Sequence, residues 1–252
     1  NVDEDMPYNV YAGMQDNGNW YGPGYTWKRG GIRTLYWQYL VGGDGFYISP
    51  DPENSRFGYG TSQGGDLYRY DKVSGYYVSS QPPAPQDTSL RFNWNAAFAR
   101  DPFDDNTVYS GSQFVHKSID EGANWTIISP DLSTNNPQHQ QLDYGGLTLD
   151  LSGAEMYNSI LSVAPSSVDR QLIWAGTDDG QLHLTRDGGK SWTNLTQRIS
   201  GMPKEAWIAR VILSEYEPGT DPYTHLLSHE TPEHLVCRLL LEKKNHEHIS
   251  YV

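Results

Sequence analysis

Asp16 and Asp44 are the side chains of this sequence whose type and setting first suggest chemistry. Asp16 stands in a polar stretch at residues 15–18, and Asp44 stands in a glycine-rich stretch at residues 42–45. A glycoside hydrolase needs two carboxyl groups across a cleft, about 5–5.5 Å apart in retaining enzymes and about 6.5–9.5 Å apart in inverting ones. Asp16 and Asp44 are therefore the candidate catalytic pair, with Asp178 or Asp179 opposite them.

A second set of side chains has the chemistry of ligand recognition. Amides hydrogen-bond to hydroxyl groups, flat aromatic rings offer apolar faces, and charged groups fix orientation. The set comprises Asn17, Gln63, Arg91, Asn93, Trp94, Gln113, Asp178 and Asp179. The competing interpretation is that the Asp-Asn-Gly and Asp-Asp-Gly stretches are ordinary hairpin turns. The sequence leaves both interpretations open.

Other reactive sites fit this sequence less well. A sialidase needs an arginine cluster, for which Arg33, Arg91 and Arg210 are the candidates, but their spacing along the chain does not show that they meet. Cys237 with His234, His246 and His248 could ligate zinc, yet these residues lie in an atypical tail. No glycine-rich phosphate loop follows a strand and opens a helix. We expect no bound metal and no cofactor.

Four β-rich phrases that end in glycine indicate how these side chains are positioned. The phrases end at Gly13, Gly60, Gly111 and Gly176. The last three each follow a short apolar run and a turn rich in Pro, Asp and Asn, which predicts strand, turn, strand in every copy. Their intervals start near the ~40–50 residues of a propeller blade and grow by loop insertion.

The repeat also predicts which side chains share a face of the molecule. In a propeller blade, strands A to D run outward from the axis. If the glycine-ended phrase is strand B, the B–C turns and the entries to strand A lie on one face. We expect Asp16, Asp44 and the ligand-recognition set to meet there, near the axis where propellers commonly bind ligands.

Two copies of an eight-residue motif, Ser/Thr-x-Asp-x-Gly-x-x-Trp, lie between the predicted strands C and D. Their residues are Ser118, Asp120, Gly122 and Trp125 in one copy and Thr185, Asp187, Gly189 and Trp192 in the other. We interpret them as structural. Asp accepts hydrogen bonds from the following amides, Gly supplies a positive φ, and Trp covers the seam between blades.

This motif resembles the Asp box, or bacterial neuraminidase repeat. With the wider repeat, it makes residues 5–210 similar to the large secreted bacterial propeller proteins that share Asp boxes with sortilin-type receptors. Sialidases and xyloglucanases also use this repeat, so the resemblance implies a fold and export to the periplasm, cell surface or medium, but no activity. It also implies that the chain works with the remainder of a longer propeller.

The expected fold is all-β: a β-propeller fragment of about four four-stranded antiparallel blades with Asp-box turns. The third and fourth blades should lie near residues 91–129 and 157–196. We assign residues 1–210 to the partial propeller and residues 211–252 to a degenerate fifth blade or an anomalous tail. Within that tail, residues 233–244 form an apolar run with helical character.

Composition narrows the function classes. The formal net charge is −13 and the pI is about 4.9, so an acidic surface argues against a nucleic-acid partner. No apolar stretch approaches the ~18 residues of a membrane span, which argues against membrane insertion. We therefore expect an exported, non-enzymatic module that binds a glycan or a protein. The alternative is a glycoside hydrolase that acts on a polysaccharide.

Overall fold

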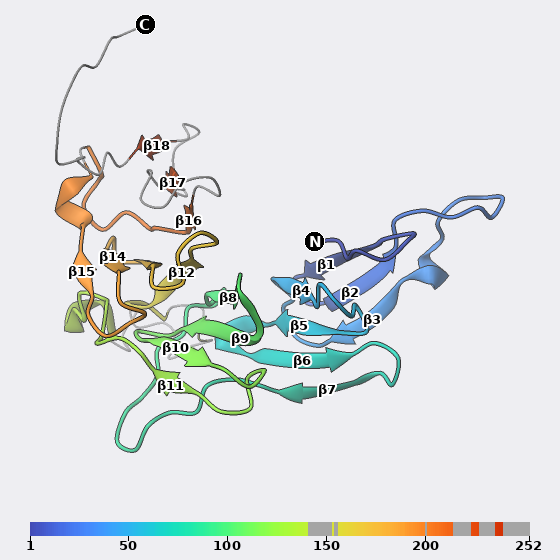
Figure 1. The fold of residues 1–252 in the computed structure, drawn as a ribbon, viewed down its shortest axis with the longest axis horizontal. Helices are drawn as coiled ribbons and strands as arrows, with labels where there is room; N and C mark the ends of the chain where they lie inside the picture. The colour runs from blue at the N-terminus through green and yellow to red at the C-terminus, as the bar shows by residue number, and fades with distance from the viewer. Residues whose placement is uncertain (141–152, 154–155, 200, 214–222, 227–234, 239–252) are drawn as a thin grey trace, which may run out of the picture.

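The computed structural model shows an all-β protein built of five antiparallel sheets that follow one another along the chain (Figure 1). It describes residues 1–140, 153, 156–199, 201–213, 223–226 and 235–238. Three sheets have four strands and two have three. The predicted β-propeller fragment is confirmed: in the described residues, four successive blades are followed by a fifth, three-stranded sheet.

Each sheet is a blade, numbered here in chain order. Blade 1 holds β1 (Asn9–Met14), β2 (Gly18–Pro23) and β3 (Gln38–Val41). Blade 2 holds β4 (Ile48–Pro50), β5 (Phe57–Thr61), β6 (Leu67–Asp71) and β7 (Tyr76–Ser79). Blade 3 holds β8 (Phe98–Asp101), β9 (Asp104–Gly111), β10 (Val115–Ser118) and β11 (Thr126–Ile127). Blade 4 holds β12 (Ile160–Pro165), β13 (Ile173–Thr177), β14 (Leu182–Thr185) and β15 (Thr193–Asn194). Blade 5 holds β16 (Arg210–Ile212), β17 (Tyr223–Leu226) and β18 (Leu235–Arg238).

Strand order within each four-stranded blade is sequential, so its strands are A, B, C and D in chain order. Each glycine-ended phrase forms strand B, as β1, β5, β9 and β13. In blade 1 an isolated bridge from Val2 to Val10 stands where strand A would pair. Burial falls outward: β13 is buried throughout, whereas every residue of β7, β11 and β15 is exposed.

The apolar core lies between consecutive blades. Four buried clusters fill the four seams, in order Tyr11, Leu40, Val41, Ile48 and Tyr70; Tyr59, Leu67 and Val108; Ala97, Tyr109, Val115, Leu132, Ile160, Val163, Ile173 and Ala175; and Leu172, Trp174, Leu182, Leu184, Leu195, Ile199, Ile208 and Val211. Every blade therefore depends on its neighbour for burial of its apolar faces.

The glycine at the end of strand B is explained by close packing at these seams. A Cβ at Gly111 would lie 2.9 Å from Cβ and Cγ2 of Ile160, at the start of strand A of the next blade. A Cβ at Gly176 would collide with Ile208, and one at Gly13 with the backbone of Gly45 and Phe46. At these three positions the glycine is therefore where strand B meets the entry to the following blade, whereas Gly60 lies against Val41 and Asn19 of the preceding blade.

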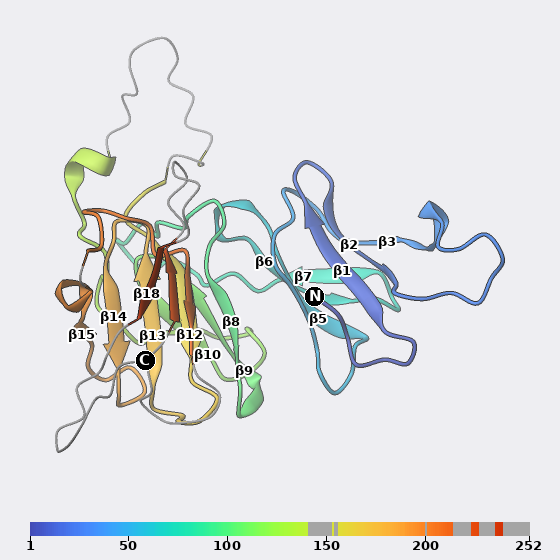
Figure 2. The ribbon, with the colours of Figure 1, turned by 90° about the horizontal axis from the view of Figure 1, so that it is seen from above.

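Blades 1 and 2 lie at one end of the molecule and blades 3 to 5 at the other, as Figures 1 and 2 show. A long connection between β2 and β3 extends away from blade 1 at the outer end. Four short 3₁₀ helices complete the structure: Thr34–Tyr36, Gln63–Gly65, Pro137–Gln140 and Thr196–Arg198. Among the described residues, no helix is long and apolar enough to cross a bilayer.

The expected helical character of residues 233–244 is wrong where the structure describes that segment. Leu235–Arg238 is strand β18, which pairs antiparallel with β17. Pairing with a neighbouring strand decides the conformation here, because a short apolar run has no decisive periodicity of its own. The rest of the run and the histidines that follow Cys237 lie outside the described residues.

Candidate ligand-binding site

A pocket of about 590 Å³ opens at the B–C end of blades 1 and 2. Its walls are Asp16, Asn17, Gly18, Tyr39, Gly43, Asp44, Gln63 and Trp94. Five of these are residues that the sequence assigned to the shared face: both members of the candidate catalytic pair and three of the ligand-recognition set. They come from the turn after β1, the link from β3 to β4, the turn after β5 and the link that enters blade 3.

Backbone hydrogen bonds join these four segments in two pairs, and the amide of Asp44, which donates to Oε1 of Gln63 (2.6 Å), links the pairs. The amide of Gly18 donates to the carbonyl of Gly43 (2.8 Å), and the amide of Gly45 donates to the carbonyl of Met14 (3.0 Å). The amide of Gly64 donates to the carbonyl of Trp94 (3.1 Å). The pocket is therefore held by main-chain contacts between neighbouring blades, which makes its geometry largely preformed.

Asp44 is the central carboxylate of the pocket, and its side chain is half-buried. Its Oδ1 accepts a hydrogen bond from the amide of Asp16 (2.8 Å), and its Oδ2 accepts one from Nε1 of Trp94 (3.1 Å). Both oxygens are thus engaged by N–H donors. Asp44 fixes the turn that carries Asp16 and the orientation of the Trp94 ring.

Asp16 and Asn17 form the exposed rim of the same pocket. Asp16 adopts a left-handed backbone conformation (φ 60°), which Asp tolerates better than most residues. Within the described part of the chain, no donor reaches the Asp16 carboxylate. This carboxylate is available to accept hydrogen bonds from a ligand.

Two aromatic rings complete the pocket. Trp94 is half-buried, and Tyr39 is 50% exposed and packs edge-on against Trp20 with ring centroids 5.4 Å apart. Tyr39 was not predicted from the sequence as a site residue, because it lies on the outer strand β3, outside the B–C turns and strand-A entries. Its only signal was its place just before the 42–45 stretch.

The B–C turns of blades 2, 3 and 4 share one hydrogen bond that the sequence did not reveal. A side-chain oxygen of each turn accepts the backbone N–H of the link that enters the same blade. The pairs are Gln63 with Asp44 (2.6 Å), Gln113 with Arg91 (2.8 Å) and Asp179 with Thr134 (2.7 Å). These side chains anchor the incoming link, which is a structural task.

The prediction that Gln113 and Asp179 contact a ligand is therefore corrected. Gln113 is 2% exposed and Asp179 is fully buried, so neither side chain reaches the surface. Asp179 also accepts hydrogen bonds from Nδ2 of Asn158 (2.6 Å) and Oγ1 of Thr177 (2.5 Å). A carboxylate with this many donors is satisfied inside the protein.

Asn93 and Asp178 form a second buried pair, and the prediction that they contact a ligand is corrected for the same reason. Nδ2 of Asn93 donates to Oδ2 of Asp178 (3.2 Å), which also accepts the hydroxyl of Ser159 (2.5 Å). The amide of Ser159 donates to Oδ1 of Asp178 (2.9 Å). Burial raises the pKa of Asp178 to about 6, although these hydrogen bonds act in the opposite direction.

Arg91 links two segments of the fold and does not line the pocket. Its guanidinium pairs with Asp131 (2.6 Å) and donates to the carbonyl of Asn158 (3.1 Å). The arginine cluster of a sialidase is also absent among the described residues. Arg33 lies beyond the far end of β2, and Arg210 lies on β16 of blade 5, so neither meets Arg91 at the pocket.

A second concavity, of about 640 Å³, follows the innermost strands β4, β8, β12 and β16. It corresponds to the axis of the propeller. Of the candidate site residues, Arg210 lines it, whereas Asp16, Asp44 and the ligand-recognition set do not. Within the described residues, no group of three or more His, Cys, Asp or Glu side chains could hold a metal ion.

The two Ser/Thr-x-Asp-x-Gly-x-x-Trp motifs form the C–D turns of blades 3 and 4. Asp120 accepts hydrogen bonds from the hydroxyl of Ser118 (2.8 Å) and the amide of Asn124 (2.8 Å). Asp187 accepts equivalent bonds from Thr185 (2.8 Å) and the amide of Ser191 (2.9 Å). Hydrogen bonds from Ser191 lower the pKa of Asp187 to about 2, and those from Asn124 lower the pKa of Asp120.

The tryptophans of these motifs tie each blade to the preceding one. Nε1 of Trp125 donates to the carbonyl of Ser80, after β7, at 2.9 Å. Nε1 of Trp192 donates to the carbonyl of Ile128, after β11, at 2.8 Å. Gly122 and Gly189 have positive φ values of 81° and 100°, as the tight turns require. The motif therefore clamps the outer seam between blades.

Comparison with known proteins places the fold but no activity. Neither a protein-family model nor a curated protein matches the sequence. An ancestral GH74 enzyme superposes with a TM-score of 0.54 at 17% identity, over 90% of this chain and 27% of that one. The GH74 xyloglucanase from Xanthomonas campestris gives 0.52 at 16% identity, over 86% and 32%. A chain of the mitotic checkpoint complex gives 0.50 at 13% identity, over 90% and 58%.

At these identities the likeness shows a shared β-propeller fold and nothing more. The chain spans about a third or less of the length of the two GH74 enzymes. Their fold supports the sheet order described above.

Proposed function

We propose that this chain is a non-catalytic, exported β-propeller binding module whose pocket between blades 1 and 2 binds a glycan, with a protein ligand as the other candidate. The observation that carries the proposal is the convergence of Asp16, Asn17, Asp44, Gln63 and Trp94 on one open pocket. Export and membership of the Asp-box proteins follow from the motif resemblance and belong to the proposal.

The pocket offers the mixed chemistry that sugar recognition needs. Exposed side-chain oxygens of Asp16 and Asn17 can accept hydrogen bonds from sugar hydroxyl groups, and Nε2 of Gln63 can donate a hydrogen bond to a sugar oxygen. The Trp94 and Tyr39 rings supply apolar faces for the C–H surface of a pyranose. An open pocket of about 590 Å³ matches one or two sugar units rather than a buried metabolite.

Binding rather than hydrolysis is favoured by the hydrogen bonds of Asp44. A general acid must carry a proton on a carboxyl oxygen and deliver it to the leaving group. Both oxygens of Asp44 face N–H donors instead, from the Asp16 amide and the Trp94 ring. Asp44 is arranged as an acceptor that holds the walls of the pocket.

One observation keeps glycoside hydrolysis as the second candidate. Asp16 and Asp44 come from different blades, yet both line the same pocket, as paired catalytic carboxyls would. The fold is also shared with GH74 enzymes, one of them a xyloglucanase. A hydrolase of this kind would act on a polysaccharide.

The deciding experiment combines calorimetric binding with turnover assays on one panel of plant and animal glycans, xyloglucan included. We expect binding without turnover. Trp94→Ala should weaken binding by roughly tenfold or more, because the ring face is lost. Trp94→Phe should weaken it less, since a ring remains. Asp87→Asn, an exposed site away from the pocket, is the matched control.

Three results would change the conclusion. Turnover that disappears in Asp16→Asn or Asp44→Asn, with folding intact, would establish the hydrolase. Glycan binding that is equal in the native chain and in Trp94→Ala would remove the pocket from the proposal. The absence of any glycan binding, together with a protein ligand lost in Trp94→Ala, would leave the pocket but replace its ligand.

A further inference from the structure

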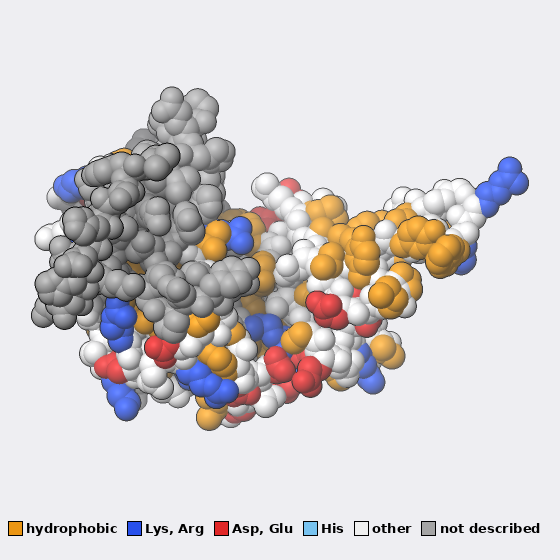
Figure 3. Space-filling model, turned by 45° about the horizontal axis from the view of Figure 1, so that its top comes forward, with side chains coloured by type: hydrophobic (Ala, Val, Ile, Leu, Met, Phe, Trp, Pro, Cys, Tyr) orange, Lys and Arg blue, Asp and Glu red, His pale blue; other side chains and the backbone are white. Residues whose placement is uncertain are grey.

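The connection from β2 to β3, residues 24–37, is an arm that projects from blade 1 away from the rest of the molecule (Figures 1 and 3). It carries one short 3₁₀ helix, Thr34–Tyr36, none of whose residues is buried. The corresponding C–D turns of blades 3 and 4 are compact Asp-box turns. The arm is therefore an addition to the blade that seam packing does not require.

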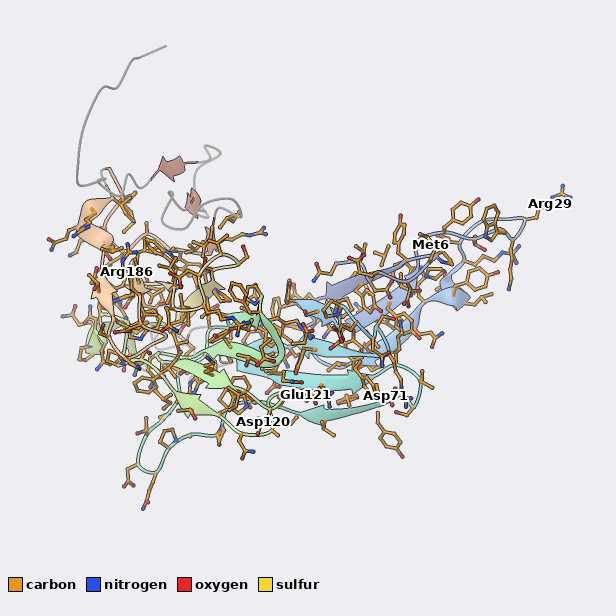
Figure 4. All side chains as sticks on the ribbon, in the orientation of Figure 1. Met6, Arg29, Asp71, Asp120, Glu121 and Arg186 are labelled. Atoms are coloured by element: carbon orange, nitrogen blue, oxygen red, sulfur yellow. The ribbon has the colours of Figure 1, made fainter. Side chains whose placement is uncertain are left out.

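The arm is positively charged, in contrast to the chain as a whole. It contains Lys28, Arg29 and Arg33 and no Asp or Glu, in a protein whose formal net charge is −13. All three cations are exposed. Arg29 stands at its far tip, as Figure 4 shows. The charge segregation means that an anionic ligand would be attracted to the arm while the acidic body repels it.

A groove of about 330 Å³ lies where the arm leaves blade 1. Its walls include the rings of Tyr21, Tyr25 and Tyr36, the amine of Lys28, and the amides of Asn9 and Gln38. The hydroxyl of Tyr21 donates to Oε1 of Gln38 (3.0 Å), and Nζ of Lys28 stands 5.2 Å from the centroid of the Tyr36 ring. The groove thus combines flat rings, amides and one cation.

Aromatic surface continues from the groove along the arm. Trp27 is 87% exposed and packs edge-on against Tyr25, which is 49% exposed, with ring centroids 4.8 Å apart. Exposed apolar rings at a projecting element mark a binding surface, because water contact with them is unfavourable. Figure 3 shows these hydrophobic side chains along the arm with the cationic groups at its end.

We propose that the arm and its groove form a second binding site, for a polyanionic glycan. The rings of Tyr25, Tyr36 and Trp27 would pack on sugar faces. Lys28, Arg29 and Arg33 would pair with carboxylate or sulfate groups spaced along the polymer. Amides in the groove suit hydroxyl groups, which favours a glycan over a nucleic acid.

This site is separate from the pocket that contains Asp44. The arm follows the end of β2, whereas Asp16 and Asn17 precede its start, so the two sites lie at opposite ends of blade 1. The inference does not rest on the proposed function of that pocket. Either site can fail its test without affecting the other.

The test measures binding of the full chain to polygalacturonate, to its methyl ester, and to heparin, by affinity electrophoresis and calorimetry. The ester keeps the sugar chain and removes the charge. We expect the acid form to bind at least about tenfold more tightly than the ester, and binding to weaken as salt rises. Binding to heparin as well would identify charge density, rather than the carboxylate, as the recognised feature.

Matched variants locate the binding. The triple variant Lys28→Gln, Arg29→Gln, Arg33→Gln should lose at least about tenfold in affinity for polygalacturonate. The control Arg186→Gln, Lys190→Gln, Lys204→Gln removes three exposed cations between β14 and β16, far from blade 1 in the sequence, and should bind normally; Arg186 is labelled in Figure 4.

Tyr25→Ala should weaken binding of polygalacturonate without altering the melting temperature of the protein, since the Tyr25 ring is half-exposed. Equal losses in both triple variants would overturn the proposal, because they would show a nonspecific charge effect. So would an absence of binding to every anionic glycan, with oligomerisation of the chain lost in the arm variant, which would make the arm a protein interface. Tighter binding of a single-stranded oligonucleotide than of the glycans would also refute it.

Discussion

The buried carboxyl group of Asp178 makes the stability of the fold depend on pH. Its side chain is fully buried in blade 4, with hydrogen bonds from Ser159 and Asn93, and no cation among the described residues pairs with it. Burial raises its pKa to about 6 from an ordinary value of 3.8. Replacement by Asn keeps the shape and removes the titration.

The direction of the pH dependence of stability follows from which state, folded or unfolded, holds the proton on Asp178. Between about pH 4 and pH 6, the folded state holds a proton on Asp178 that the unfolded chain has released, so stability falls as pH rises through this window. A difference of about 2 pKa units corresponds to roughly 3 kcal/mol. Above about pH 6 the folded protein carries a buried charge, and the full cost is present.

The assay is urea unfolding of the native chain and Asp178→Asn at about pH 4.5 and about pH 7.5. Relative to the variant, the native chain should lose roughly 2–3 kcal/mol between the two pH values. The exposed carboxyl of Asp87 provides the control, and Asp87→Asn should follow the native chain. If the curves of the native chain and Asp178→Asn run parallel, the carboxyl is ionised at little cost and the reasoning from burial is wrong.

Three further predictions concern other parts of the fold. Burial lowers the pKa of His116 to about 4, so the native chain should lose roughly 3 kcal/mol relative to His116→Gln as pH falls from about 6.5 to about 4, which unfolding titrations would detect. Gly111→Ala should destabilise by roughly 1–3 kcal/mol, because the added Cβ would meet Cβ and Cγ2 of Ile160 and Cβ of Ala97; an unchanged free energy of unfolding in urea would exclude a clash at this seam. Trp192→Phe loses the hydrogen bond to the carbonyl of Ile128 and should cost roughly 0.5–1.5 kcal/mol in thermal melts without affecting glycan binding; an unchanged melting temperature would show that the bond does not contribute.

The blade pattern was predictable because seam packing repeats. The close approach of strand B to the entry of the next blade recurs at Gly13, Gly111 and Gly176, and the sequence places a glycine at each of them. The turns formed by the two Ser/Thr-x-Asp-x-Gly-x-x-Trp motifs are local, with Asp120 and Asp187 bonded to residues within four positions. Local turn contacts and repeated packing contacts can therefore be predicted from a single sequence.

The ligand-binding face was only partly predictable, because residue type does not encode burial. Gln63 and Gln113 occupy equivalent turns and accept the same kind of hydrogen bond from an incoming link. Gln63 nevertheless lines an open pocket, whereas Gln113 is covered. Which side chain faces solvent depends on segments that are distant in the sequence.

The lengths of the links between blades explain why Asp16, in the turn after β1, is exposed whereas Gln113 and Asp179 are covered. The link into blade 2 runs only from residue 42 to residue 47, whereas those into blades 3 and 4 run from 80 to 97 and from 128 to 159. In the longer links, Leu132 bonds to the carbonyl of Gln113 and Thr134 bonds to the carboxylate of Asp179, so chain lies over both turns. The short link supplies no such cover, and it leaves Asp16 exposed on the rim of the pocket. The proposed binding function is therefore assigned to blades 1 and 2, where the same turn chemistry that closes the other blades faces solvent.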